Sequence, residues 1–350
     1  MHFGSDNWAG AHPAIAESLV RHAGGYAAAY GNSDLDRKVE RLFCDVFERE
    51  VAVFFVGTGT AANALALTSA DRPGGISFCH REAHAIEDEC GAPEYFMGGS
   101  RLFAVDGPDG RMDPANLEAA LGRYDPPSVH MGRPAAISIT QATEIGTVYP
   151  VDAIGRIAEI AHARGLPLHM DGARFANALV SLGVTPAEMT WKAGVDMVSF
   201  GGTKNGCWCA EALVFMDRDK AADFAYMRKR AAQLFSKSRF VAAQFEAYFE
   251  DGRWLEMAAH ANAMASRLAT LFRNAASARL AWEPQANEVF PVFTGALAER
   301  LKAAGIVFYD WPLPHGRDPL GPDEVLCRFV TSFATTEADV DAVGRLLGNR

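Results

Sequence analysis

The chain has 350 residues, a formal net charge of −10 and 49% hydrophobic residues. This length allows two domains with a substantial core, and the composition is typical of a globular protein. The acidic balance and the lack of any basic run argue against nucleic acid or an anionic membrane as a partner. The sequence shows no apolar leader and no apolar run long enough for a membrane span, so we expect a cytoplasmic protein.

Six cysteines are few for a chain of this length, whereas disulfide scaffolds are short and rich in cysteine. Cys207 and Cys209 are separated by one residue, which differs from the C-x-x-C pairs of structural zinc sites. We therefore predict reduced thiols that pack as small hydrophobic side chains, and no metal site.

Residues 1–30 are expected to form an irregular N-terminal arm. Residues 33–49 have the apolar spacing of a helix, which Ser33 and Asp34 would cap. Short apolar runs then alternate with helical patterns as far as residue 216. The predicted strands are 51–56, 76–79, 135–140, 166–170, 195–200 and 211–216, and the helices are 61–70, 83–90, 153–164 and those opened by Asp113 and Thr185. This alternation indicates an α/β fold with a mostly parallel sheet and helices on both faces.

The character of the chain changes after residue 216. Residues 218–274 are predicted to be almost wholly helical. Beyond them lie predicted strands at 287–293, 306–310 and 324–332 and helices at 295–304 and 336–347. We expect these to form a smaller C-terminal α+β domain. The predicted organisation is an N-terminal arm at 1–30, a large domain at 31–250 and a small domain at 251–350.

Lys204 stands at the carboxyl end of the predicted strand 195–200, directly after two glycines. Of the seven lysines in the chain, it alone is flanked by small uncharged residues. An ammonium ion there is poorly hydrated, which favours the neutral amine, and a neutral amine can attack a carbonyl. Lys204 is therefore a candidate for a lysine that forms a Schiff base.

Two further segments suggest what Lys204 would bind. Asp171 also ends an apolar strand, and a lysine with an aspartate is the pair of protein groups that pyridoxal phosphate chemistry requires most. The turn at 57–60 follows a strand and opens a helix, so its amides and the Thr58 and Thr60 hydroxyls could hold a phosphate. Taken alone, that turn could equally be an ordinary glycine turn capped by threonine. The three segments together indicate one cofactor site.

These segments, in this order, resemble the threonine aldolase/β-eliminating lyase family of fold-type-I pyridoxal phosphate enzymes. The resemblance covers most of the chain and is greatest to L-threonine aldolases of low stereospecificity. It implies a fold-type-I architecture, pyridoxal 5′-phosphate held by the large domain, and a small amino-acid substrate. It also implies a homo-oligomer, a dimer of dimers, with the site near a subunit interface. The other similar segments are 5–7, 30–32, 81–84, 89–91 and 327–332.

The resemblance also implies roles for individual residues. Lys204 would form the Schiff base, and Asp171 would keep the pyridine nitrogen protonated. His84 would stack on the cofactor ring near the substrate hydroxyl. Gly59 and Thr60 would bind the cofactor phosphate, with Thr203 as a further candidate. Ser5, Arg174 and Arg328 would bind the substrate carboxylate, and Arg174 would also contact the cofactor.

The residues themselves leave alternatives open. His84 could instead cap a helix or lie on the surface, and Arg174 could pair with a nearby carboxylate. Arg328 alternates with apolar residues, so it is either at a sheet edge or directed into a site. One segment departs from the family: many members have Glu-Asn-Thr-His after the central strand, whereas this chain has Thr140–Glu144, without a histidine, and Thr143 stands where many relatives have a second imidazole. His84 is then the main ring base.

The resemblance implies retro-aldol cleavage of L-threonine, L-allo-threonine and related L-β-hydroxy-α-amino acids such as phenylserine to glycine and an aldehyde. Two other activities stay open. One is a different pyridoxal phosphate reaction, β-elimination or transamination, which would give a keto acid or transfer the amino group. The other is binding of the cofactor without turnover, against which the intact set of Lys204, Asp171 and His84 argues.

Overall fold

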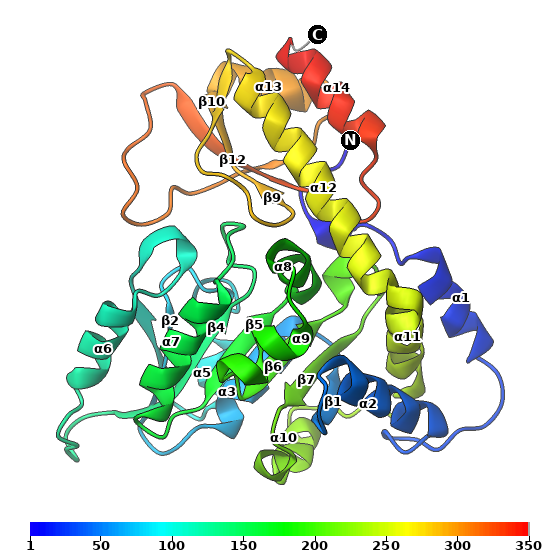
Figure 1. Cartoon of the computed structure of the whole chain (residues 1–350), viewed down its shortest axis with the longest axis vertical. Coiled ribbons are helices and arrows are strands. Elements are labelled where there is room, and N and C mark those ends of the chain that lie inside the picture. The colour runs from blue at the N-terminus through cyan, green and yellow to red at the C-terminus, as the bar shows by residue number, and fades with distance from the viewer. Residues whose placement is uncertain (349–350) are drawn as a thin grey trace.

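The computed structural model describes residues 1–348, in which the larger sheet has seven strands in the order β1-β7-β6-β5-β4-β2-β3 (Figure 1). All neighbouring strands are parallel except that β7 runs antiparallel to β1 and to β6. The strands are β1 (Ala52–Val56), β2 (Gly75–His80), β3 (Arg101–Val105), β4 (Arg133–Thr140), β5 (Leu168–Gly172), β6 (Met197–Gly201) and β7 (Glu211–Phe215).

Helices cover both faces of this sheet. Phe43, Phe175 and Phe245 belong to the main core on one face, and Leu65 and Phe224 belong to a separate core on the other. The α/β architecture with a mostly parallel sheet is therefore confirmed. The helices of this part are α2 (Asp34–Val46), α3 (Gly59–Ser69), α4 (His84–Glu87), α5 (Ala92–Phe96), α6 (Pro114–Gly122), α7 (Val151–His162), α8 (Phe175–Leu182), α9 (Pro186–Met189), α10 (Phe224–Arg230) and α11 (Arg239–Phe249).

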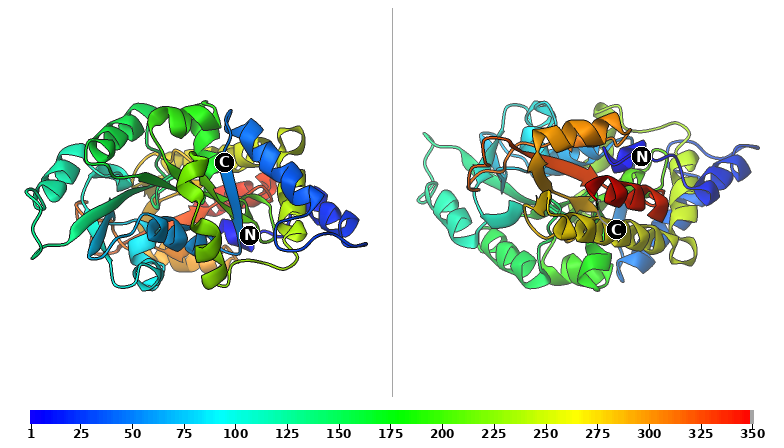
Figure 2. Two further views of the ribbon diagram at one scale, coloured as in Figure 1. Left: turned by 90° about the horizontal axis from the view of Figure 1, so that it is seen from below. Right: turned by 90° about the horizontal axis from the view of Figure 1, so that it is seen from above.

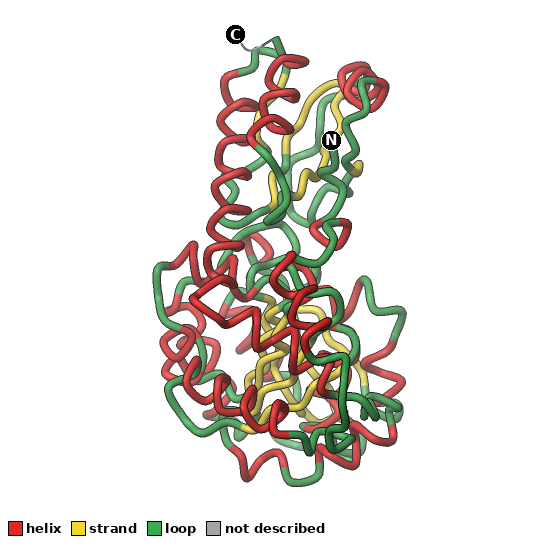
Figure 3. The backbone as a smooth tube through the Cα atoms, turned by 90° about the vertical axis from the view of Figure 1, so that its right-hand side faces the viewer, coloured by secondary structure: helices red, strands yellow, loops and turns green. Residues whose placement is uncertain are grey.

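A second, smaller sheet lies beyond α12 (Arg253–Asn274), with strand order β11-β12-β10-β8 and β9 paired to β12. Its aromatic core includes Phe272, Phe293 and Phe329. Figure 3 shows this unit standing on the larger one, with α12 running between them. Its elements are β8 (Ala278–Leu280), β9 (Glu288–Val289), β10 (Pro291–Thr294), α13 (Gly295–Ala303), β11 (Tyr309–Asp310), β12 (Glu324–Val330) and α14 (Glu337–Leu347).

Two sheets with separate cores support the proposed large and small domains, although the boundaries at 30 and 250 stay proposals. The last two residues of the proposed unit 251–350 lie outside the described residues. Within residues 1–348, every helix is too short or too polar to cross a membrane.

The N-terminal arm connects the two units. The Phe3 amide donates to the Val307 carbonyl at 2.8 Å and the Phe3 carbonyl accepts from the Val330 amide at 2.8 Å, so the chain starts inside the smaller unit. It then passes through the 3-10 turn Asp6–Trp8 and forms α1 (Pro13–Arg21), which lies against α11 at one edge of the molecule (Figure 2).

The prediction of an irregular arm was therefore wrong for α1. A proline at its first position and the His12 ring, which accepts a hydrogen bond from the Ala14 amide, start this helix. Other expected elements differ in detail. The helix predicted at 83–90 is only the short helix α4, and α5 follows it as a separate helix. The strand predicted at 287–293 is divided into β9 and β10, and β3 and α8 were not predicted.

Candidate active site

The parallel strands of the larger sheet bring the predicted site residues to one edge. Because β1, β2, β4, β5 and β6 are parallel, the segments that follow their carboxyl ends meet there. The turn at 57–60 follows β1, His84 follows β2, Glu144 follows β4, Asp171 lies at the end of β5, and Lys204 follows β6. Segments that are far apart in the sequence therefore surround one site.

A chain of hydrogen bonds connects Asp171 to His84. Asn63 of α3 donates through its side-chain nitrogen to Oδ2 of Asp171 at 2.7 Å and to Oε1 of Glu89 at 2.8 Å. The other Asp171 oxygen accepts from the Ala173 amide at 3.0 Å. The buried Asp171 carboxylate is thus held in one orientation by two donors. Asn63 and Glu89 were not among the predicted site residues.

Glu89 also fixes the ring of His84. The Nδ1 atom of His84 lies 2.9 Å from Oε1 of Glu89, whose side chain is 0% exposed, while the His84 side chain is 31% exposed. Because the Glu89 carboxylate accepts, Nδ1 carries a proton, and in the neutral ring Nε2 keeps its lone pair. The hydrogen bond to Glu89 raises the pKa of His84, and burial raises the pKa of Glu89. Because α4 has no side-chain cap, His84 is not a capping residue.

Glu89→Gln is expected to move the acidic limb of the kcat/KM profile to lower pH. His84 must be neutral to act as a base. Because its pKa is raised, the ring becomes neutral only at a higher pH than an ordinary histidine does. Loss of the Glu89 charge lowers that pKa, so the neutral ring persists at more acidic pH. The measurement is the pH profile of both enzymes, with exposed Glu87→Gln as the matched control. An acidic limb that stays in place would show that Glu89 does not act through His84.

Close backbone approaches position Lys204. A Cβ atom on Gly201 would lie 2.7 Å from the Ala173 carbonyl oxygen, and one on Gly202 would lie 2.8 Å from that of Ala210. Glycines are therefore required where β6 runs beside the Asp171 loop. Burial raises the pKa of Glu211 to about 7, and this carboxyl, like those of Asp6 and Glu144, interacts electrostatically with the Lys204 ammonium.

Thr203 is occupied within the protein. Its amide donates to Oε1 of Glu211 at 3.3 Å, its hydroxyl also bonds to Glu211, and its hydroxyl oxygen accepts from the Ala210 amide at 3.2 Å. These bonds hold the turn that carries Lys204. A role of Thr203 toward a phosphate stays a prediction.

The turn after β1 leaves free space next to Gly59. The Thr58 hydroxyl accepts from the Ala61 amide at 3.0 Å and caps α3. The next amides, those of Gly59 and Thr60, lie in the first helical turn and have no intrahelical partner. No heavy atom lies within 4 Å of a Cβ placed on Gly59, so an anion has room to approach these donors.

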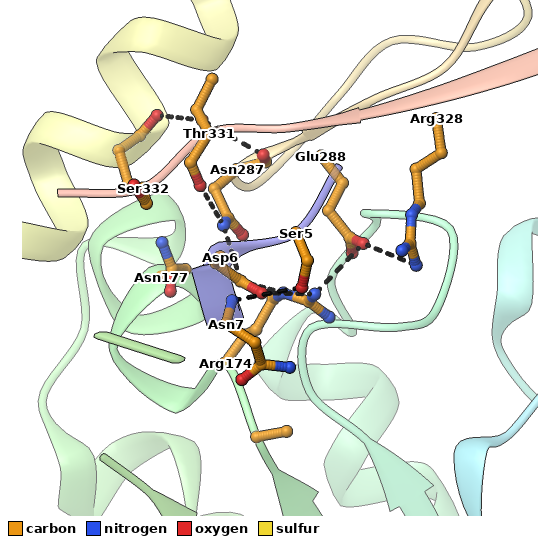
Figure 4. Close-up of polar contacts among 12 residues, drawn as sticks. Ser5, Asp6, Asn7, Arg174, Asn177, Asn287, Glu288, Arg328, Thr331 and Ser332 are labelled. Atoms are coloured by element: carbon orange, nitrogen blue, oxygen red, sulfur yellow. Dashed lines mark hydrogen bonds and ion pairs between the residues drawn. The ribbon is translucent and has the colours of Figure 1, made fainter. Parts of the chain in front are cut away.

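Both predicted carboxylate-binding arginines are paired with acids (Figure 4). Arg174 donates from Nε to Asp6 at 2.8 Å and from Nη2 to its other oxygen at 3.2 Å. Glu288 lies 3.4 Å from Arg174 and 3.7 Å from Arg328. Ser5 lies beside them, and its hydroxyl accepts from the Asn7 amide at 3.1 Å. Asp6 and Glu288 were missed, although Glu288 is an acid inside the predicted strand 287–293 and could have been noticed there.

The loop after β4 carries Thr143 and Glu144 near the site. Thr143 is buried and its hydroxyl bonds to that of Thr147 at 2.7 Å. The titratable group of this loop is instead Glu144, whose pKa is raised by burial and whose charge interacts with Lys204, His84 and Arg174. The carboxyl group of Glu144 therefore adds a titratable acid to the surroundings of Lys204 and His84.

A model of the beta-eliminating lyase family matches residues 2–295 of the chain. The chain belongs to the beta-eliminating lyase family. This confirms the family that the sequence motifs indicated, and it makes the protein a lyase. Members of this family, including the threonine aldolases, are pyridoxal phosphate enzymes.

Individual members of the beta-eliminating lyase family are similar over nearly the whole chain. A low specificity L-threonine aldolase of Pseudomonas sp. (strain NCIMB 10558) is 41% identical, over 97% of this chain and 94% of the relative. One from Pseudomonas aeruginosa is 42% identical, over 88% of each chain. The solved structure of a Leishmania major threonine aldolase superposes with a TM-score of 0.91 at 29% identity, covering 99% of this chain and 98% of that one.

The residues at the sheet edge fit the cofactor of this family. Pyridoxal phosphate needs an amine for its aldehyde, an anion for its pyridine nitrogen and donors for its phosphate. Lys204, the doubly held carboxylate of Asp171 and the open helix start at Gly59 would supply these three groups.

Proposed function

We propose that this protein uses pyridoxal 5′-phosphate to cleave L-threonine, L-allo-threonine and related L-β-hydroxy-α-amino acids such as phenylserine to glycine and an aldehyde. The observation that carries this proposal is the hydrogen-bonded chain Asp171–Asn63–Glu89–His84 beside Lys204. It joins the group expected at the pyridine nitrogen to the base expected at the substrate hydroxyl. The two Pseudomonas relatives, named low specificity L-threonine aldolases, support this substrate class.

Each proposed role follows from the contacts of the residue. When bound, pyridoxal phosphate supplies an electron sink for the bond that breaks. The Lys204 amine would attach the cofactor and be displaced by the substrate amine. Asp171, kept oriented by Asn63 and Ala173, would hold the proton on the pyridine nitrogen. His84, with Nδ1 bonded to Glu89, has Nε2 available to remove the β-hydroxyl proton.

The substrate carboxylate would be held by Ser5, Arg174 and Arg328. Arg328 is the less committed arginine, because its Nη2 reaches only the Gly4 carbonyl at 3.4 Å and its Nε makes no hydrogen bond within the described residues. Arg174 keeps its bidentate contact with Asp6 and would attract the substrate carboxylate through its positive charge. Gly59 and Thr60 would bind the cofactor phosphate.

The test is incubation of the holoenzyme with L-threonine, L-allo-threonine and phenylserine, with glycine and aldehyde quantified. We expect all three to be cleaved and D-threonine to be rejected, because amine and carboxylate are both fixed at Cα. The kcat/KM values for the two threonine epimers should differ by less than about 200-fold, since a methyl-sized difference discriminates no further. A larger ratio would reveal a selective contact at Cβ, for which Glu144 is the candidate.

The family description favours one second activity. Because the matching family is that of beta-eliminating lyases, β-elimination on amino acids with a leaving group at Cβ is the alternative. Its products are ammonia and a keto acid, so the same incubation distinguishes it from aldol cleavage.

We also infer a cytoplasmic homo-oligomer, a tetramer built as a dimer of dimers. The support from this chain is that three large aromatic side chains of the N-terminal arm, Trp8, Tyr26 and Tyr30, are exposed to solvent. Exposed aromatic side chains are enriched at subunit interfaces. The arm also contributes Ser5 and Asp6 to the site, which would place the site close to such an interface.

A further inference from the structure

Glu288 is a buried acid shared by two arginines. It lies in β9, is 0% exposed, and faces Nη2 of Arg174 at 3.4 Å and Nη1 of Arg328 at 3.7 Å through the same oxygen, Oε1 (Figure 4). Neither carboxylate oxygen makes a hydrogen bond within residues 1–348. A buried carboxylate needs hydrogen bonds as well as charge partners to remain ionised at low cost. Glu288 has only the charge partners.

Asp6 shows what a well-held acid looks like in the same cluster. It accepts two hydrogen bonds from Arg174 and one from Asn287 at 3.0 Å. Burial acts to raise the pKa of Asp6, but Arg174 and the Lys204 ammonium outweigh it and hold this pKa below its ordinary value. For Glu288, burial outweighs the arginines and raises the pKa. Of the two acids, Glu288 therefore takes up a proton more readily.

The charges of the cluster explain why a proton matters here. Arg174, Arg328, Asp6 and an ionised Glu288 sum to zero, so these four side chains together offer no excess positive charge to the carboxylate of an incoming amino acid. With Glu288 protonated, the same four side chains carry one net positive charge, and this matches one carboxylate. Arg328 is positioned to use that charge, because its guanidinium lies 4.0 Å over the Trp311 ring and keeps Nε without a hydrogen-bond partner in the described part of the chain.

We propose that Glu288 sets the charge of the carboxylate site: it is ionised when the site is empty and protonated when a substrate carboxylate lies between Arg174 and Arg328. The proton comes from solvent and forms an O–H bond on Glu288, so the binding of one carboxylate takes up one proton. This inference rests on the proposed function, because it takes the ligand to be an α-amino acid held by these arginines.

Four charged groups interact electrostatically with Glu288. They are Arg174 before α8, Arg328 in β12, Asp6 in the 3-10 turn of the arm, and Glu144 in the loop after β4. The arginines stay charged throughout the accessible pH range and Asp6 is held ionised. Glu144, whose pKa burial also raises, is the competing proton acceptor, so the test must separate it from Glu288.

The experiment titrates the holoenzyme with 3-hydroxybutyrate, which is threonine without its amino group, so that no substrate amine exchanges a proton. Calorimetry in buffers with different ionisation heats counts the protons taken up. We expect about one proton for each 3-hydroxybutyrate bound above the pKa of Glu288, and a Kd that rises about tenfold for each pH unit there. Glu288→Gln should abolish both the proton uptake and the pH dependence. Glu299→Gln, an exposed glutamate of α13, should behave as wild type.

Each outcome decides the proposal. Binding of 3-hydroxybutyrate to the wild type without proton uptake overturns it, and so does a pH dependence that persists in Glu288→Gln but disappears in Glu144→Gln. If Glu288→Gln does not fold, the wild-type proton count and Glu144→Gln still decide. Glycine formation from L-threonine is measured separately. Proton uptake without glycine would contradict only the proposed function, whereas glycine without proton uptake would contradict only the role of Glu288.

Discussion

Lys204→Ala is expected to lower kcat/KM for L-threonine by about 10³-fold or more, because it removes the amine that attaches the cofactor. The remaining site keeps Asp171, Asn63 and His84 in place, since none of the hydrogen bonds that hold these side chains involves Lys204. The loss should therefore be chemical rather than structural. Borohydride reduction of the wild-type holoenzyme followed by peptide mapping should place the pyridoxyl group on the peptide that contains Lys204.

Lys192→Ala is the matched control for this substitution. Lys192 lies on the surface, where its ammonium pairs with Glu48 at 2.7 Å, remote from the carboxyl edge of the sheet. We expect wild-type turnover and a wild-type labelling pattern for this variant. A pyridoxyl group on any of the other six lysines of the wild type would contradict the assignment of Lys204.

The positions of Lys204 and Asp171 could be predicted because they depend on local patterns. Each follows an apolar run that becomes a buried strand, β6 or β5, and parallel strands place their carboxyl ends together. The partners of these residues depend on contacts between distant segments. Asn63 reaches Asp171 across 108 positions of the chain, and Asp6 reaches Arg174 across 168. No periodicity within a window of sequence encodes such pairs, so Asn63, Glu89, Asp6 and Glu288 were not predicted.

The elements that were missed lack the usual local signals. The residue before α8, Arg174, cannot cap the helix, because a guanidinium has no acceptor for a backbone amide; it binds Asp6 and Glu288 instead. A helix start without Ser, Thr, Asp or Asn is hard to recognise from sequence. Strand β3 lies at the edge of the sheet and is only partly buried, which weakens its apolar pattern. In both cases tertiary contacts determine the structure, and in α8 the missing signal coincides with a proposed substrate contact.

Asp171→Asn is expected to lower kcat by about 10²–10³-fold while the protein still binds pyridoxal phosphate. The amide has nearly the same shape and can still accept from the Ala173 amide, but it carries no negative charge to hold a proton on the pyridine nitrogen. It also turns a donor toward the Asn63 side chain, which now donates to Asp171 at 2.7 Å and to Glu89 at 2.8 Å. Cofactor affinity, kcat and thermal stability should all be measured on the same preparation.

Asp196→Asn is the control that separates charge loss at the site from loss of a structural carboxylate. Asp196 accepts from the Leu168 amide at 2.8 Å and pairs with His162 at 2.9 Å, before β6 begins and therefore at the opposite end of the sheet. We expect this variant to lose some thermal stability and to keep its kcat. Asp171→Asn should instead lose kcat and keep most of its thermal stability, because its carboxylate is required for turnover rather than for packing. Equal kcat in Asp171→Asn and wild type, in a folded protein loaded with cofactor, would remove Asp171 from the proposed mechanism.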